Sequence, residues 1–173
     1  MARAKLEVEL AQLRLGERHL ATKLFAESGS QPFLAIVAHD SDDDNTVVAL
    51  CDSYNYEAFK ELFASAEEVI RRLKSCPTIM PLDAISNLME LEIKIGRLEI
   101  AETKITCDLR IDRARTVEFV LMFSDWDTDE RVFLHVSAID YKRFKNFLRE
   151  SDSVIESLYA QRQISDRFLI TAS

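Results

Sequence analysis

Each half of the chain opens with a strict alternation of apolar and polar residues. Residues 6–10 are Leu-Glu-Val-Glu-Leu, and residues 91–95 are Leu-Glu-Ile-Lys-Ile. A period of two places alternate side chains on opposite faces of a strand, so both segments are predicted to be strands with one face in water. The apolar parity then shifts by one residue, and a bulge or tight turn must intervene because such a shift otherwise turns the side chains over. Gly96 and Arg97 suit this irregularity in the second half.

Three further strands are predicted in each half. They are Leu20–Ala26, Phe33–Ala38 and Thr46–Cys51 in the first half, and Ile105–Ile111, Val117–Phe123 and Arg131–Val136 in the second. In the last two strands of each half almost every residue is apolar. Because both faces of such strands are hydrophobic, we expect them at the centre of a sheet that is covered on both sides.

An amphipathic helix closes each half. Apolar residues recur at helical spacing along Phe59–Leu73 and along Phe144–Leu158, which predicts helices of roughly 18 residues with one face toward the core. Residues that can cap the helix starts are Asp52 or Ser53 in the first half and Ser137 and Asp140 in the second.

The two halves are copies of one unit. Shifted by 85 residues, the chain aligns with itself without a gap: Tyr56 and Lys60, for example, fall on Tyr141 and Lys145. We therefore predict an α+β fold, a tandem duplication of a ββββα unit with antiparallel sheets and one long helix per repeat. Residues 1–75 form the first repeat, 76–85 a proline-containing linker and 86–173 the second repeat, and the two pack as one globular domain. A short terminal strand is expected at Arg167–Thr171.

Composition narrows the class of protein. With 22 basic and 30 acidic residues the net charge is −8, which disfavours binding to nucleic-acid phosphates. The three cysteines have no Cys-x-x-Cys spacing, so we expect reduced, buried thiols in a cytoplasmic protein. No apolar run reaches the roughly 20 residues of a membrane span, and the N-terminal residues lack the apolar core of a secretory signal.

The tandem ββββα arrangement resembles the Whirly and PUR families of single-stranded nucleic-acid-binding proteins. The resemblance is one of topology, and it covers nearly the whole chain. It implies two intertwined units with curved sheets outside, helices packed inside, and binding of single-stranded nucleic acid. The Lys-Gly-Lys-Ala-Ala signature of Whirly proteins has no counterpart, and the exposed side of the first strand carries Glu7 and Glu9. No functional residue is carried over from these families.

Two acidic turns share an Asp-x-Asp-x-Asp spacing. Alternating carboxylates can line a Ca²⁺ loop, but the glycine and glutamate that an EF-hand requires are replaced by Asn45 and Cys51, and by Glu130 and Val136. The pattern favours a solvated hairpin end that discourages edge pairing. Trp126 in the second turn is either an anchor for a partner or a ring folded over a neighbouring strand. The candidate partner-binding residues are Trp126, Asp40, Asp42, Asp44, Asp125, Asp127 and Asp129.

No catalytic constellation is visible in the sequence. His19, His39 and His135 are separated, and no nucleophile motif or glycine-rich phosphate loop accompanies them. His39 beside the first acidic turn is either an ordinary loop histidine or a metal ligand. We therefore expect no enzyme activity, no cofactor and no resident metal.

The sequence leaves two functional hypotheses. The first is a non-enzymatic protein-interaction module, such as a regulator, inhibitor or adaptor, with an acidic surface; its partner is another protein or, as a homodimer, a second copy. The alternative is a single-stranded nucleic-acid binder of the Whirly or PUR type. Its candidate contacts are Arg110, Arg113, Arg115 and Arg131, although acidic residues interleaved with them also fit a salt-bridged strand edge.

Overall fold

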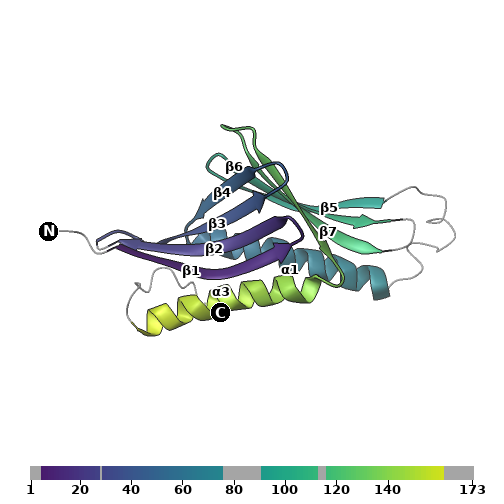
Figure 1. The fold of residues 1–173 in the computed structure, drawn as a ribbon. Helices are drawn as coiled ribbons and strands as arrows, with labels where there is room; N and C mark the ends of the chain where they lie inside the picture. The colour runs from purple at the N-terminus through teal and green to yellow at the C-terminus, as the bar shows by residue number, and fades with distance from the viewer. Residues whose placement is uncertain (1–4, 28, 76–90, 113–115, 162–173) are drawn as a thin grey trace.

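The elements of the chain follow the same order twice. The computed structural model describes residues 5–27, 29–75, 91–112 and 116–161. The first repeat comprises β1 (Lys5–Leu15), β2 (Arg18–Glu27), β3 (Phe33–Asp40), β4 (Asn45–Cys51) and helix α1 (Ser53–Ser75). The second comprises β5 (Leu91–Ile100), β6 (Thr103–Ile111), β7 (Val117–Asp125), β8 (Arg131–Ser137) and helix α3 (Tyr141–Ala160). In each repeat the four strands form an antiparallel sheet in sequence order (Figure 1). The predicted tandem ββββα duplication is confirmed, whereas the expected linker and terminal strand lie outside the described residues.

The backbones of the two repeats match in detail. Strand β1 shifts register against β2 between Glu9 and Ala11, and β5 shifts against β6 at the equivalent place, between Lys94 and Gly96. These are the irregularities that the parity shift in the sequence predicts. The turn after β3 and the turn after β7 each contain an aspartate at positive φ, Asp44 at 55° and Asp129 at 57°. The duplication therefore extends to the local backbone conformation.

The edge strands differ from our expectation. Strands β4 and β8 are the last strands of their sheets rather than central ones. Their inner residues are buried, but on the opposite face Val48 is 41% exposed and Leu50 is 57% exposed. The prediction that these strands are covered on both faces was therefore wrong. Apolar composition alone does not distinguish a strand buried on both faces from one that keeps a hydrophobic face in contact with water.

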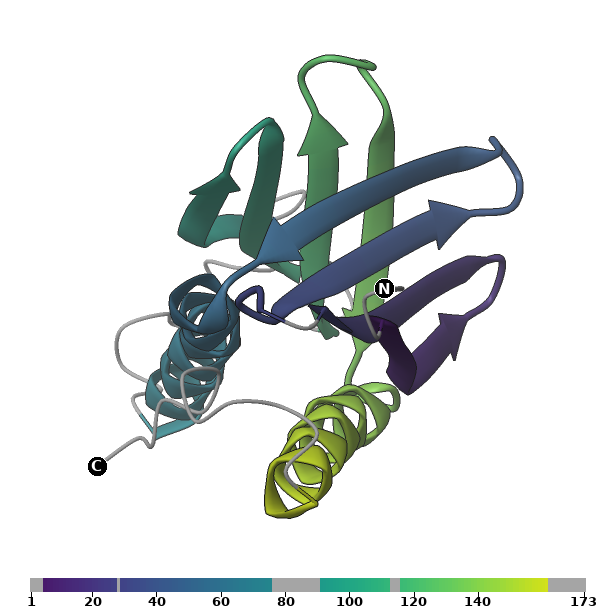
Figure 2. The same ribbon diagram turned by 90° about the vertical axis from the view of Figure 1, so that its left-hand side faces the viewer.

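The helix of each repeat packs against the sheet of the other repeat. Helix α1 of the first repeat packs against β5 and β6, and helix α3 of the second repeat packs against β1. Figure 2 shows the two sheets crossing, with α3 below the β1 edge of one sheet and α1 below the other. In the core, the ring of Phe63 from α1 lies 5.3 Å from that of Phe119 on β7 and 4.4 Å from that of Phe144 on α3. Neither repeat buries its own sheet without the helix of the other, so the two repeats form one packed unit.

Each sheet covers part of the free edge of the other. The Thr103 hydroxyl at the start of β6 donates to the carbonyl oxygen of Val48 on β4, at 3.1 Å. The Asn45 amide at the start of β4 donates to the carbonyl oxygen of Arg131 on β8, at 3.2 Å. These contacts occupy acceptors that an exposed edge strand would offer to another chain.

The helix starts follow the sequence only in part. The Asp52 carboxylate accepts a hydrogen bond from the Asn55 backbone N–H at 2.8 Å, as an N-cap does. Asp140 occupies the N-cap position of α3, but its side chain makes no capping hydrogen bond. Its carboxylate instead accepts from the hydroxyl of Ser137 and from Arg143.

Candidate interaction surfaces

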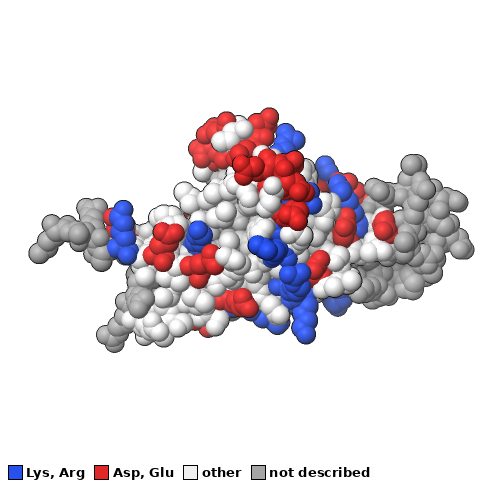
Figure 3. Space-filling model, viewed as in Figure 1, with Lys and Arg blue, Asp and Glu red and all other residues white. Residues whose placement is uncertain are grey.

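The two acidic turns come together at one end of the molecule. The hydrogen bond from Asn45 to Arg131 joins the start of β4 to the start of β8, and it brings the two hairpin ends side by side. Figure 3 shows their carboxylates gathered at the top of the molecule, above a largely uncharged surface over β2 to β4. The exposed acidic residues of this surface, which we call the acidic tip, are Asp42, Asp43, Asp44, Asp127 and Asp129.

Asp40 and Asp125 accept hydrogen bonds from backbone N–H groups within their own turns, and of the two only Asp40 is buried. Asp40 is 3% exposed, and its carboxylate accepts from Arg18 Nε at 3.0 Å and from the Asp42 backbone N–H at 3.0 Å. Burial alone would raise the pKa of Asp40, but these hydrogen bonds and the charge of Arg18 outweigh it and lower the pKa. Asp125 accepts from the backbone N–H groups of Asp127 and Thr128. The carboxylate of Asp40 is therefore enclosed and already paired, in contrast to the exposed aspartates of the two turns.

Trp126 lies in the outward-facing part of the second turn. Its backbone N–H donates to the carbonyl of Glu102 in the neighbouring β5–β6 turn, at 3.0 Å. The side chain is 58% exposed, so more than half of the indole remains in contact with water. Of the two interpretations of Trp126, the structure favours the exposed ring.

The acidic turns do not form a ligand cage among the described residues. No group of three histidine, cysteine, aspartate or glutamate side chains in the described ranges is placed to hold a metal ion. His39 Nδ1 lies 2.8 Å from the hydroxyl of Thr46 on the neighbouring strand.

The outer face of the first sheet is apolar, a feature that the sequence analysis did not single out. The alternation of side chains places Ala21 and Lys23 of β2 on this face together with six apolar residues, which we call the first outer face: Phe25, Phe33, Ala35, Val37, Val48 and Leu50. The rings of Phe25 and Phe33 stack at 5.1 Å and 15°. Phe33, Val48 and Leu50 are exposed large hydrophobic residues, and Figure 3 shows a largely uncharged surface over β3 and β4, with charged residues toward β1.

The equivalent face of the second sheet keeps three apolar residues, Val120, Met122 and Phe133, and replaces the other three with polar or charged ones. Eighty-five residues after the stacked pair Phe25 and Phe33 stand Arg110 and Glu118, and after Leu50 stands His135. Glu118 and His135 lie 3.3 Å apart on adjacent strands. The first outer face could have been predicted from the sequence by comparing the residue types at these equivalent positions of the two repeats.

The candidate nucleic-acid contacts are only partly placed. Arg110 Nε lies 3.6 Å from the carboxylate of Glu92, and Arg131 lies 3.7 Å from that of Asp129. These pairs agree with the salt-bridged strand edge that the sequence also allows. Arg113 and Arg115 lie outside the described residues.

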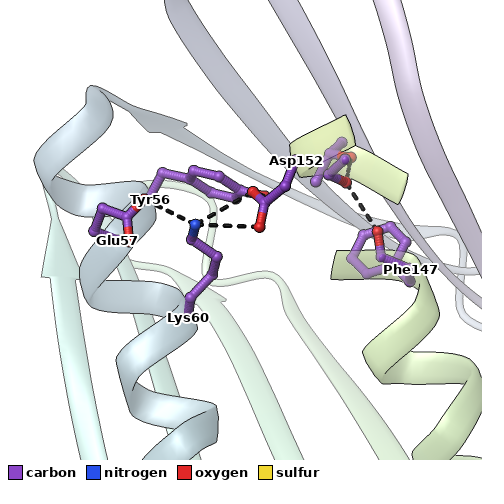
Figure 4. Close-up of polar contacts among 7 residues, drawn as sticks. Tyr56, Glu57, Lys60, Phe147 and Asp152 are labelled. Atoms are coloured by element: carbon purple, nitrogen blue, oxygen red, sulfur yellow. Dashed lines mark hydrogen bonds and ion pairs between the residues drawn. The ribbon is translucent and has the colours of Figure 1, made fainter. Parts of the chain in front are cut away.

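A polar clasp holds the two helices together. The Tyr56 hydroxyl on α1 donates to the Asp152 carboxylate on α3 at 2.8 Å, and the Lys60 ammonium lies 3.2 Å from the same oxygen (Figure 4). The Lys60 ammonium also lies 2.8 Å from Glu57 and 4.7 Å from the centre of the Tyr56 ring. Burial of the phenol, and then the charge of Asp152, raise the pKa of Tyr56 far above its ordinary value. The clasp is a stabilising contact in which the phenol stays protonated.

One cavity of about 590 Å³ opens beside α1, between the start of β7, the end of β8 and the start of α3. Its walls include Val117, Phe119 and Tyr141, with Glu67 at the rim. The Glu67 carboxylate is paired with Lys145 at 3.0 Å. The walls also include Glu68, which is paired with Arg71 at 2.7 Å, and Glu118, which lies 3.3 Å from His135. The described walls therefore combine apolar side chains with carboxylates that already have partners.

No family model matches the chain, and neither a curated protein nor a solved structure matches it. The resemblance to Whirly and PUR proteins stays a prediction based on topology. None of the described helices is both long and apolar enough to span a lipid bilayer.

Proposed function

We propose that this protein is a non-enzymatic interaction module that binds a basic partner protein at the acidic tip. The observation that carries the proposal is the meeting of two acidic hairpin ends, one of which presents the exposed indole of Trp126. The partner surface that fits is a cationic segment with an apolar residue for the indole to cover. A cytosolic location is part of the proposal and is supported by the buried free thiols of Cys51 and Cys107.

The chemistry of the tip supports this assignment. Carboxylates on neighbouring turns add their fields, which attracts a basic partner and raises the rate of association. Tryptophan is enriched among the residues that contribute most to binding energy at protein interfaces. The tip thus combines long-range attraction with one large contact residue.

The single tryptophan of the chain provides the test. We expect titration with an oligolysine peptide that contains one leucine to shift Trp126 fluorescence at low ionic strength, and the shift to disappear as salt is raised. Asp127→Asn combined with Asp129→Asn should weaken binding about tenfold or more. A matched pair on the exposed side of α3, Glu150→Gln with Glu156→Gln, removes the same charge and should change affinity by less than about threefold. Equal affinities for the two double variants would refute the assignment to the tip.

One observation favours the alternative, single-stranded nucleic-acid binding. On the outer face of the second sheet, Phe133 is 37% exposed and lies in the row of Thr106 and Met122, next to the row that contains Lys104 and Arg131. Basic and aromatic side chains on adjacent strands are the components that stack and neutralise single strands. Fluorescence anisotropy of a labelled oligothymidylate at two salt concentrations tests it. Salt-sensitive binding that Phe133→Ala and Lys104→Glu abolish would support this function, and absence of binding at low salt would eliminate it.

A further inference from the structure

We propose that the first outer face packs against the same face of a second copy of this chain, in a symmetric face-to-face dimer. This inference is independent of the acidic tip, which lies at the hairpin ends and not on the sheet face. The dimer would cover the stacked rings of Phe25 and Phe33 together with Val48 and Leu50. Hydrophobic faces of two sheets pack in this way in sandwich folds, with the strands nearly aligned.

The second repeat supplies the internal comparison that makes the first outer face unusual. Both repeats have the same strands, registers and bulges, so the fold itself makes the same demands on the two outer faces. Yet Arg110, Glu118 and His135 stand in the second sheet where Phe25, Phe33 and Leu50 stand in the first. The ββββα unit therefore does not require apolar residues at these three positions, although Val120, Met122 and Phe133 keep the other three apolar. An apolar patch that folding does not require indicates a surface that another molecule covers.

The charged residues beside the first outer face indicate that the molecule covering it is a second copy of this chain. Glu7 and Arg14 lie on the outer side of β1, near opposite ends of the strand. Glu7 is next to Phe25 on β2, and Arg14 is next to His19 on β2. Both side chains are exposed on their strand, and within the described ranges neither has an ion-pair partner. A two-fold axis that lies between the faces and runs across the strands exchanges the two ends. Arg14 of one copy then lies over Glu7 of the other, twice by symmetry.

The same axis also matches the apolar rows. Val37 and Val48 share one row across β3 and β4, and Ala35 and Leu50 share the next. The axis lays the first row of each copy on the second row of the other, so aliphatic side chains of β3 and β4 meet across the centre. On β2 the same rows hold Ala21 and Lys23, and Lys23 stays beside Glu9 of its own β1 while it lies over Ala21 of the other copy. An axis parallel to the strands would instead place Glu9 over Leu50 and Lys23 over Ala35, and it would separate Glu7 from Arg14, so more charges would lie against apolar side chains without an opposite charge. The charges thus select one arrangement, in which the two acidic tips point to opposite ends of the dimer.

Sedimentation velocity over a concentration series tests the proposal. We expect the wild-type chain to form a species of twice 19.9 kDa. Val48→Lys places an ammonium in the interface and should raise the dissociation constant at least about 100-fold. The matched control is Phe133→Lys, at the equivalent position of the second sheet and with a similar exposure, 37% against 41% for Val48. It should leave the dissociation constant unchanged.

A charge exchange tests the arrangement without touching the apolar residues. Arg14→Glu alone should weaken the dimer about tenfold through two like-charge contacts with Glu7. Adding Glu7→Arg should restore the affinity to within about threefold of the wild type. Because both residues are exposed, the substitutions should not disturb folding, and circular dichroism of each variant checks this.

A chain that sediments at 19.9 kDa at every concentration would overturn the inference and leave the acidic tip untouched. So would a dimer that Phe133→Lys disrupts and Val48→Lys does not. A dimer that the exchange of Glu7 and Arg14 fails to restore would refute the face-to-face arrangement across the strands.

Discussion

Lys60 on α1 forms an ion pair with Asp152 on α3, with 3.2 Å between the ammonium nitrogen and the carboxylate oxygen. The equivalent pair runs in the opposite direction: Lys145 on α3 lies 3.0 Å from Glu67 on α1. Each residue stands 85 positions from its counterpart, so the duplication has placed the two pairs symmetrically across the contact between the helices. The two contacts differ in two respects: Asp152 also accepts from the buried Tyr56 hydroxyl, and Lys60 also pairs with Glu57, whose counterpart is Lys142.

These differences predict unequal effects of removing the two carboxylates. We expect Asp152→Ala to lower the free energy of unfolding by about 1–2 kcal/mol, because it takes an acceptor from a buried phenol as well as a partner from Lys60. Glu67→Ala should cost less than about 1 kcal/mol, because this half-buried pair has no buried hydroxyl among its hydrogen-bond donors. Urea unfolding followed by circular dichroism measures both. Equal losses would show that the bond from Tyr56 adds nothing to stability.

A buried hydrogen bond between Thr22 and Ser151 predicts that substitutions of these two residues have non-additive effects on stability. The hydroxyls of Thr22 on β2 and Ser151 on α3 lie 2.6 Å apart, and Ser151 also donates to the carbonyl of Phe147. The equivalent positions in the other half hold Cys107 and Ala66, both fully buried. We expect Thr22→Cys and Ser151→Ala each to destabilise the fold by about 1 kcal/mol, and the double variant to cost clearly less than their sum because it reproduces the other half. A double-mutant cycle in urea measures this, and strict additivity would contradict it.

The pair of Arg18 and Asp40 predicts a dependence of stability on pH. Because the folded-state pKa of Asp40 lies below its ordinary value of 3.8, the folded protein binds this proton less readily than the unfolded chain. The contribution of the carboxylate is therefore complete above about pH 4 and is lost as the pH falls through the lowered pKa. We expect Asp40→Asn to cost about 1–2 kcal/mol at pH 7 and much less near pH 2.5, measured by urea unfolding at both values. Asp43→Asn, an exposed neighbour, serves as the control and should change stability little at pH 7; a pH-independent cost at Asp40 would contradict the prediction.

The buried cysteines should be chemically inert in the native state. Burial, and then the adjacent carboxylate of Asp52 or Asp108, raises the pKa of Cys51 and of Cys107 to about 12. At pH 8 only about one thiol in ten thousand is then ionised, and the thiolate is the reactive form. In a Cys76→Ser background, a disulfide reagent should label neither thiol in the native protein within minutes and both in urea. Rapid labelling of the native protein would show that the sheets open readily.

Several features of the fold could be predicted from the sequence because they depend on local spacing. The alternation at residues 6–10 specifies a strand, the parity shift before Leu13 specifies a bulge, and the apolar stripe from Phe59 specifies a helix. The internal repeat specifies that all of these occur twice. Each conclusion needs only the geometry of one element or a comparison of the chain with itself.

The candidate surfaces were less accessible to this reasoning. The sequence identified Trp126 and the exposed aspartates of the turns, but it did not separate them from Asp40, which has the same composition around it. Asp40 differs from the exposed aspartates because it forms an ion pair with Arg18, which lies 22 residues earlier in the chain, on β2. The exposure of a residue depends on neighbours that are distant in the sequence, and a local sequence pattern does not identify them.

The sequence by itself determined the repeating unit, the order of its elements and the net negative charge. Only the tertiary structure decided that each helix crosses to the sheet of the other repeat, that β4 and β8 are edge strands, and that the two acidic turns lie side by side. The physical reason is that periodicity reports which face of an element avoids water, whereas the identity of the surface that covers that face depends on packing between distant segments.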